Sequence, residues 1–267
     1  MFVDTHCHIF DCAFDTDRTD VINKCLSENV SKLIVVGFDK KTNELALELS
    51  RKYAFIYPTV GLHPTELDDY SDNFFVYLEN LIKENKEIVG IGECGLDYYW
   101  DDSKKDLQKK VFLKQIELSL KYNLPLIIHS RDAIGDTLEV LKSVNKPILG
   151  VMHGYSGSLE MAREFVKLGL KIGIGGVVTF KNAKNVKEVV KELDLSNFVL
   201  ETDCPYLTPT PYRGKRNAPF YIPLIAKEIA ELKGIDIKEV EEATTNNANK
   251  LFGGRLLWKK YYLLYWW

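Results

Sequence analysis

The sequence lacks several features that mark large classes of protein. None of its five cysteines forms a C-x-x-C pair, which argues against a disulfide framework and fits a reducing compartment. The net charge is −3, so any contact with nucleic acid must come from a local basic patch. We see no basic region ahead of an apolar run, and no apolar run approaches the roughly 20 residues that a membrane span needs. We therefore expect a cytoplasmic protein that contacts no membrane.

The chain also lacks repeats, low-complexity segments and flexible linkers. What it has is an alternation of short apolar runs with longer segments of helical spacing, clearest at 107–122 and 158–169. The strand candidates are "FVDTHCH", "KLIVVGF", "AFIYPTVG", "EIVGIGEC", "LPLIIHS", "PILGVMH", "LKIGIGG" and "NFVLETD". Strands alternating with helices predict an α/β fold, the (β/α)8 TIM barrel, with a doubly wound open sheet as the alternative.

All five histidines fall where a predicted strand ends. They are His6 and His8 after the first strand, His63 after the third, His129 after the fifth and His153 after the sixth. Three carboxylates share these ends: Glu93 at the fourth strand, and Glu201 and Asp203 at the eighth. Each residue alone has a structural explanation, such as a satisfied polar group or a cap. Core packing, however, gives no reason for every histidine to lie at the end of a barrel where active sites form.

Buried carboxylates beside imidazoles are costly unless they are paired or bound to a cation, so this rim predicts divalent metal ions. Strand alternation places His6 and His8 on one face with Phe2, and Cys7 on the other face with Val3. Two ions need a bridging ligand, and Glu93 is the candidate. Mixed nitrogen and oxygen ligands suit Zn, Mn, Fe or Ni, and an oxygen-rich outer sphere also admits Mg.

Motifs along the chain match a known family in order. They are "DTHCH" (4–8), "GLHP" (61–64), "GIGECGLDYY" (90–99), "IIHSRDA" (127–133), "HGYSG" (153–157), "ETDCPYL" (201–207), "RGKRNAP" (213–219) and "TTNNANKLF" (244–252). The chain resembles the TatD family of metal-dependent deoxyribonucleases, within the amidohydrolase-like TIM barrels, from residue 1 to about residue 252. One such motif is weak evidence, but the ordered set is specific.

The resemblance implies two divalent ions per chain, Mg, Mn or Zn. It assigns His6, His8 and Asp203 to the first ion. It assigns His129 and His153 to the second, with Glu93 bridging both. His63 and Arg131 are expected near the substrate phosphate.

These assignments predict two-metal hydrolysis of phosphodiester bonds, with Asp203 as general base and Glu93 as the second catalytic residue. Glu201 either orients a metal ligand or holds a water. The loop 212–217 with Arg213 either contacts the phosphate backbone or is a solvated basic loop.

We expect the substrate to be DNA, met as single strands or ends because a pocket in a barrel mouth does not enclose an intact duplex. This favours exonuclease over endonuclease action, and we expect the 3′–5′ direction. Tyr98, Tyr99, Trp100 and Tyr206 either stack on a terminal base or pack within their loops.

Three alternatives remain. The first is another dinuclear-metal hydrolase of this superfamily, acting on a cyclic amide, a lactone or a small phosphoester. Such sites commonly carry a carboxylated lysine at the fourth strand, where this chain has Glu93. The second is a nucleic-acid-binding barrel without turnover. The third is a structural metal protein, whose closed zinc sites favour cysteine and histidine ligands.

The last residues form a separate feature. We expect the metallohydrolase barrel to span 1–252 and an aromatic extension to span 253–267, where three of the four tryptophans lie. The extension is either a non-native or weakly ordered tail or a patch for self-association or a partner. We favour a monomer.

Overall fold

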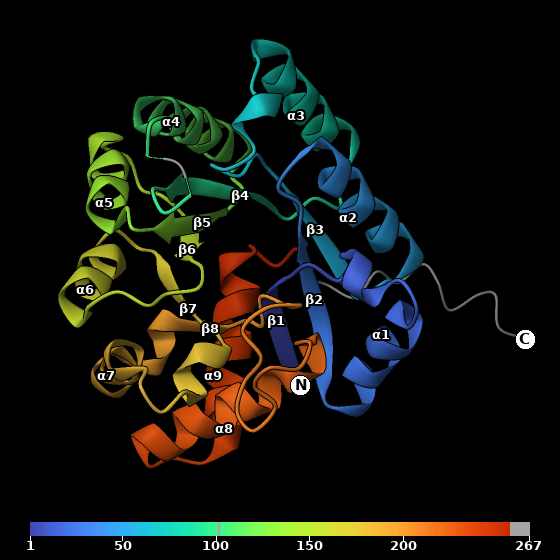
Figure 1. Cartoon of the computed structure of the whole chain (residues 1–267), viewed down its shortest axis with the longest axis vertical. Helices are drawn as coiled ribbons and strands as arrows, with labels where there is room; N and C mark the ends of the chain where they lie inside the picture. Colours follow the sequence, from blue (N-terminus) through green and yellow to red (C-terminus); the bar gives the residue numbers. More distant parts are fainter. Residues whose placement is uncertain (101, 257–267) are drawn as a thin grey trace, which may run out of the picture.

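Eight parallel strands form one sheet in sequence order, β1 to β8, in a computed structural model that describes residues 1–100 and 102–256. A parallel bridge between Cys7 and Cys204 joins the end of β1 to the segment after β8. Figure 1 shows the strands as a ring with helices outside it. The prediction of a (β/α)8 barrel is confirmed.

The strands are β1 (Phe2–Cys7), β2 (Val30–Val36), β3 (Ile56–Val60), β4 (Gly90–Asp97), β5 (Leu126–Arg131), β6 (Gly150–Met152), β7 (Lys171–Ile174) and β8 (Phe198–Leu200). The helices are α1 (Arg18–Ser27), α2 (Lys40–Lys52), α3 (Asp72–Glu84), α4 (Lys105–Tyr122), α5 (Ile134–Ser143), α6 (Leu159–Lys167), α7 (Lys184–Glu192), α8 (Ile222–Lys233) and α9 (Ile237–Leu251). Within the described ranges, no helix combines the length and apolar character that crossing a bilayer requires.

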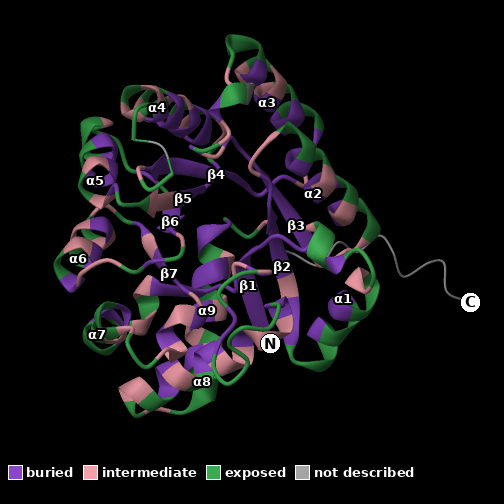
Figure 2. Cartoon of the chain, in the orientation of Figure 1, coloured by how far each residue is buried: buried purple, intermediate pink, exposed green. Residues whose placement is uncertain are grey.

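Local sequence explains where several helices begin. The Ser158 hydroxyl accepts a hydrogen bond from the Met161 backbone N–H at the start of α6. Asp236 and Glu239 form a reciprocal capping box at the start of α9. Figure 2 shows that the strands are buried and that the helices expose their outer faces. Each helix therefore contributes one apolar face to the layer around the sheet.

A second apolar cluster fills the inside of the barrel near the N-terminal ends of the strands. Phe252 and Leu256, 0% and 1% exposed, pack there with Val3 and Tyr57. The end of α9 thus closes this side of the barrel and leaves the C-terminal rim for a site. Leu256 lies within the predicted extension 253–267 yet packs in the barrel. Residues 257–267, with the three tryptophans, lie outside the described residues.

The first strand departs from simple alternation. Phe2 and Cys7 both belong to the apolar cluster between sheet and helices, while Val3 packs inside the barrel. The expectation that Phe2 shares a face with the two histidines is therefore wrong. The register of β1 against β2 shifts between Phe2 and Val3 and again between Asp4 and Cys7, and the second irregularity changes which face the end of the strand presents. Cys7 still packs away from the rim, as predicted.

Candidate metal centre

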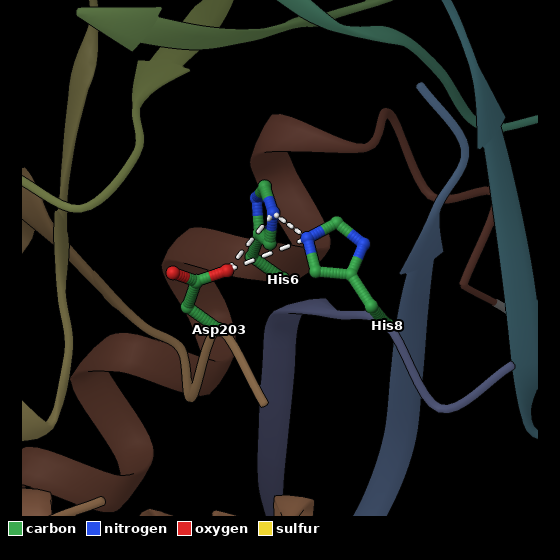
Figure 3. A group of neighbouring side chains, drawn as sticks. All are labelled: His6, His8 and Asp203. Atoms are coloured by element: carbon green, nitrogen blue, oxygen red, sulfur yellow. Dashed lines mark hydrogen bonds and ion pairs between the residues drawn. The ribbon is translucent and has the colours of Figure 1, made fainter. Parts of the chain in front are cut away.

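The first group of candidate ligands comes from β1 and the segment after β8. The Nε2 atoms of His6 and His8 lie 3.1 Å apart. Asp203 Oδ1 lies 3.7 Å from the Nε2 of His6 and 3.4 Å from that of His8. Figure 3 shows the three side chains converging from these two elements. Their ligand atoms all lie within 4.8 Å of one another, which is close enough to share one ion.

Glu93, near the middle of β4, has its two carboxylate oxygens turned toward different imidazoles. Oε2 lies 3.4 Å from the Nε2 of His6 and 3.7 Å from that of His8. Oε1 has three imidazole neighbours: His129 Nδ1 at 3.1 Å, His63 Nε2 at 3.4 Å and His153 Nε2 at 3.5 Å. One carboxylate oxygen thus faces each side of the centre, as a bridging ligand requires.

Glycines let β4 and β5 approach closely enough to form this arrangement. A Cβ atom on Gly95 would lie 2.0 Å from the backbone oxygen of His129, and one on Gly92 would lie 2.6 Å from that of Ile127. Both glycines have φ in the region that disfavours side chains, at +136° and +142°. The glycines on either side of Glu93 are therefore needed to bring Glu93 and His129 together.

Two further carboxylates hold the outer nitrogens of the histidines on β5 and after β6. Asp97 Oδ2 lies 2.9 Å from His129 Nε2, and Glu201 Oε1 lies 3.1 Å from His153 Nδ1. Both carboxylates are buried, at 1% and 0% exposure. Metal-binding histidines in proteins characteristically have such a partner on the nitrogen that does not bind the ion. Of the two roles left open for Glu201, the geometry favours orienting a ligand.

Sequence reasoning missed Asp97 as a site residue. The signal was present, because Glu93, Gly95 and Asp97 are spaced by two along one strand. Asp4 was also missed. Its side chain is fully buried and accepts hydrogen bonds from the Thr202 hydroxyl and from the backbone N–H groups of His6 and Thr202. Asp4 thereby ties the first histidine pair to the segment that carries Asp203.

The charges in the centre depend on one another. Burial alone would raise the pKa of Glu93, but the charges of His63, His6 and His153 hold that pKa well below its usual range. Burial alone would likewise raise the pKa of Asp203, and a hydrogen bond to His8 and the imidazole charges lower it. Both carboxylates are therefore ionised at neutral pH. They concentrate negative charge where the imidazole nitrogens converge.

The histidines differ in pKa. Burial lowers the pKa of His6 and of His63. For His153, burial also acts downward, but the charges of Glu201 and Glu93 outweigh it and raise the pKa to about 10. Among the described residues, His6 Nδ1 and Glu201 Oε2 are buried polar atoms without a hydrogen-bond partner. A buried cluster of imidazoles and carboxylates is stabilised by a bound cation.

A cavity of about 520 Å³ lies over the centre at the C-terminal ends of the strands. Its lining includes Asp203, His63, Arg131, Trp100 and Tyr206. Arg131 lies with its guanidinium carbon 3.8 Å from the ring centre of Tyr99. The predicted substrate residues His63 and Arg131 thus lie in the cavity. Glu201 is instead buried beside His153.

Comparisons with known proteins identify the family of this chain. A family model described as "TatD related DNase" matches residues 3–253. The chain belongs to the TatD family. The resemblance inferred from the motifs is thereby confirmed.

Two curated relatives span nearly the same length. The "Uncharacterized metal-dependent hydrolase YabD" of Bacillus subtilis is 46% identical over 253 residues, which cover 94% of this chain and 99% of the relative. The "Uncharacterized metal-dependent hydrolase YjjV" of Escherichia coli is 33% identical over 252 residues, which cover 94% of this chain and 97% of the relative. The crystal structure of YjjV, described as a TatD homolog, superposes with a TM-score of 0.90 over 94% of this chain and 97% of that chain.

Proposed function

We propose that this protein is a metal-dependent deoxyribonuclease that hydrolyses phosphodiester bonds at single-stranded DNA ends in the 3′–5′ direction. The observation that carries the proposal is the placement of Glu93, with one carboxylate oxygen facing His6 and His8 and the other facing His129 and His153. The names of the relatives support a metal-dependent hydrolase. The family description supports DNA as substrate, and the strand direction is the expectation stated from the sequence.

The donor set fits a pair of divalent ions. His6, His8 and Asp203 would hold one, His129 and His153 would hold the other, and Glu93 would bridge them. When bound, such a pair lowers the pKa of a coordinated water and stabilises charge on phosphoryl oxygens. Imidazole and carboxylate donors suit Mn or Zn, and the carboxylates also suit Mg.

Asp203 is the residue we assign as general base. Both Asp203 and Glu93 line the cavity, but the Asp203 side chain is 19% exposed and that of Glu93 only 6%. The lowered pKa of Asp203 keeps the carboxylate ionised and able to accept a proton from water. Replacing it, in Asp203→Asn, should leave metal bound and remove most turnover. Near-wild-type turnover in that variant would exclude the assignment.

Arg131 and His63 are assigned to the substrate phosphate. The cavity lining also holds Asp11, Glu66 and Asp97, so without bound cations it would repel a phosphate. Arg131 supplies a guanidinium to this lining and stacks on Tyr99. The cavity volume falls within the range of small-ligand sites, which suits the end of a strand.

The test is hydrolysis of 5′-labelled single-stranded DNA by chelator-stripped protein to which Mg²⁺, Mn²⁺ or Zn²⁺ is returned, beside Glu93→Ala. We expect a metal-dependent ladder of products that shortens from one end and is absent in the variant. A circular single strand should resist cleavage. If two ions bind but no metal supports cleavage, the substrate is instead a small phosphoester, an amide or a lactone.

A further inference from the structure

The rim around the cavity is electrically asymmetric. The segment 63–72, after β3, carries Glu66, Asp68, Asp69 and Asp72 and no lysine or arginine, and Lys104 and Lys114 form ion pairs with Asp68 and Asp72. The segments 175–187, after β7, and 204–227, after β8, contain no aspartate or glutamate. In Figure 1, β7 and β8 lie across the ring from α3, the helix that begins where the acidic segment ends. A polyanion that leaves the cavity is therefore attracted to the β7–β8 side.

The two basic segments contact each other and form one wall. The Thr210 backbone N–H donates a hydrogen bond of 2.8 Å to the Thr179 hydroxyl. The guanidinium carbon of Arg213 lies 4.0 Å from the ring centre of Phe180. We call the surface formed by 176–184 and 206–215 the basic wall.

Its cations are available to a ligand. Neighbouring Arg216 and Lys187 are paired with Asp17 and Glu228. Within the described part of the chain, no carboxylate forms an ion pair with the four exposed cations of the wall. These are Lys181, Lys184, Arg213 and Lys215. A protein with net charge −3 thus keeps a group of unpaired cations on the segments that follow β7 and β8.

Exposed aromatic and apolar side chains join the wall to the cavity. Tyr206 and Leu207 line the cavity and are 57% and 48% exposed. Farther along the loop, Tyr212 is exposed and stacks on Tyr221 with ring centres 4.9 Å apart. Aromatic rings interspersed with unpaired cations are the usual composition of surfaces that bind single strands without sequence preference.

We infer that the basic wall binds the part of a single-stranded nucleic acid that extends beyond the nucleotide held in the cavity. This inference rests on the proposed function and adds to it a binding track for the unreacted strand. Lys181 and Arg213 contact phosphates, and Tyr206 stacks on the base that leaves the cavity. The enzyme should therefore prefer longer strands to dinucleotides.

The test uses the double variant Lys181→Ala, Arg213→Ala in the full chain. Its matched control is Lys146→Ala, Arg163→Ala, which removes the same charge from exposed positions between α5 and β6 and on α6. Hydrolysis is measured on a dinucleotide and on a single strand of about 16 nucleotides, near the upper end of known single-strand site sizes. Binding of the longer strand, with phosphorothioate linkages to slow cleavage, is followed separately by fluorescence anisotropy across a salt series.

We expect the wall variant to bind the long strand about 25-fold more weakly at ~0.1 M salt. The slope of log K against log[salt] should be less steep by about 1.4, which is about 0.7 for each lost phosphate contact. Its kcat/KM should fall on the long strand and stay unchanged on the dinucleotide. Wild-type values in the variant, or an equal loss in the control, would overturn the inference while leaving dinucleotide cleavage to support the proposed function. Salt-dependent binding lost in the wall variant without cleavage of either substrate would support the wall and reject the nuclease. Neither binding nor cleavage by the wild type would reject both.

Discussion

Replacing Asp97 with asparagine should weaken the second metal position while leaving the barrel folded. Asp97 Oδ1 accepts hydrogen bonds from the backbone N–H groups of Tyr99 and Trp100, at 3.0 and 3.1 Å. In Asp97→Asn, the amide oxygen would stay at that place and the amide N–H₂ would turn toward His129. The Nε2 of His129, 2.9 Å from Oδ2 in the native chain, would then have to accept a hydrogen bond.

The substitution Asp97→Asn would move the proton of the neutral His129 ring from one nitrogen to the other. In the native chain, the carboxylate of Asp97 favours a proton on Nε2 and leaves the lone pair on Nδ1, which lies 3.1 Å from Glu93 Oε1. In the variant the proton moves to Nδ1, the atom that would bind the ion. Loss of such a partner typically costs about 10- to 100-fold in metal affinity or activity. We expect a loss of that size for the second ion, and little change for the first.

Isothermal titration with Mn²⁺, supported by metal analysis after dialysis, measures both affinities. The control is Asp136→Asn, which makes the same chemical change at a carboxylate that pairs with Lys109 and Tyr98 and touches no histidine of the centre. Circular dichroism reports whether each variant is folded. Two ions bound with native affinity by folded Asp97→Asn would refute the reasoning.

Three other predictions follow from the same structure. His63→Ala should keep two ions per chain and raise KM for DNA; loss of one ion would make His63 a ligand instead. Burial acts to lower the pKa of His153, but the charges of Glu201 and Glu93 outweigh it and raise this pKa to about 10. A proton on His153 therefore competes with the metal, and Mn²⁺ affinity should increase as pH rises from 6.5 toward 10. In chelator-treated protein, the stability contributed by the charged histidine should be complete below pH 6.5 and be lost as pH rises through about 10, and denaturation curves without that trend would contradict the assignment. Phe252→Ala should cost about 3–5 kcal/mol of unfolding free energy, because the side chain is 0% exposed in the cluster that closes the barrel, and a cost below about 1 kcal/mol in urea denaturation would show that α9 does not close it.

The sequence was sufficient to predict the barrel and the common location of the histidines. Strand ends in a (β/α)8 barrel meet at one rim, so the position of each histidine in the chain determined its end of the fold. Glu93 was predictable as a member of this group, although it lies near the middle of β4 and not at the end of the strand as expected. Which carboxylate oxygen faces which ring was not, because that depends on the close approach of β4 to β5 at Gly95.

Other features depend on contacts between distant segments. The shift in β1 depends on pairing with β2, which period-two alternation does not describe. The basic wall forms because the loops after β7 and β8 touch at Thr179 and Thr210. Leu256 was assigned to an extension because nothing in its local sequence shows that the end of α9 enters the barrel.

The central claim, that two ions held around Glu93 hydrolyse DNA, is tested most directly by titrating chelator-stripped protein with Mn²⁺ while following cleavage of single-stranded DNA. The account predicts little cleavage through the first equivalent, a rise during the second and a plateau at two ions per chain, with no rise in Glu93→Ala. Full cleavage at one equivalent, or none with two ions bound, would contradict it.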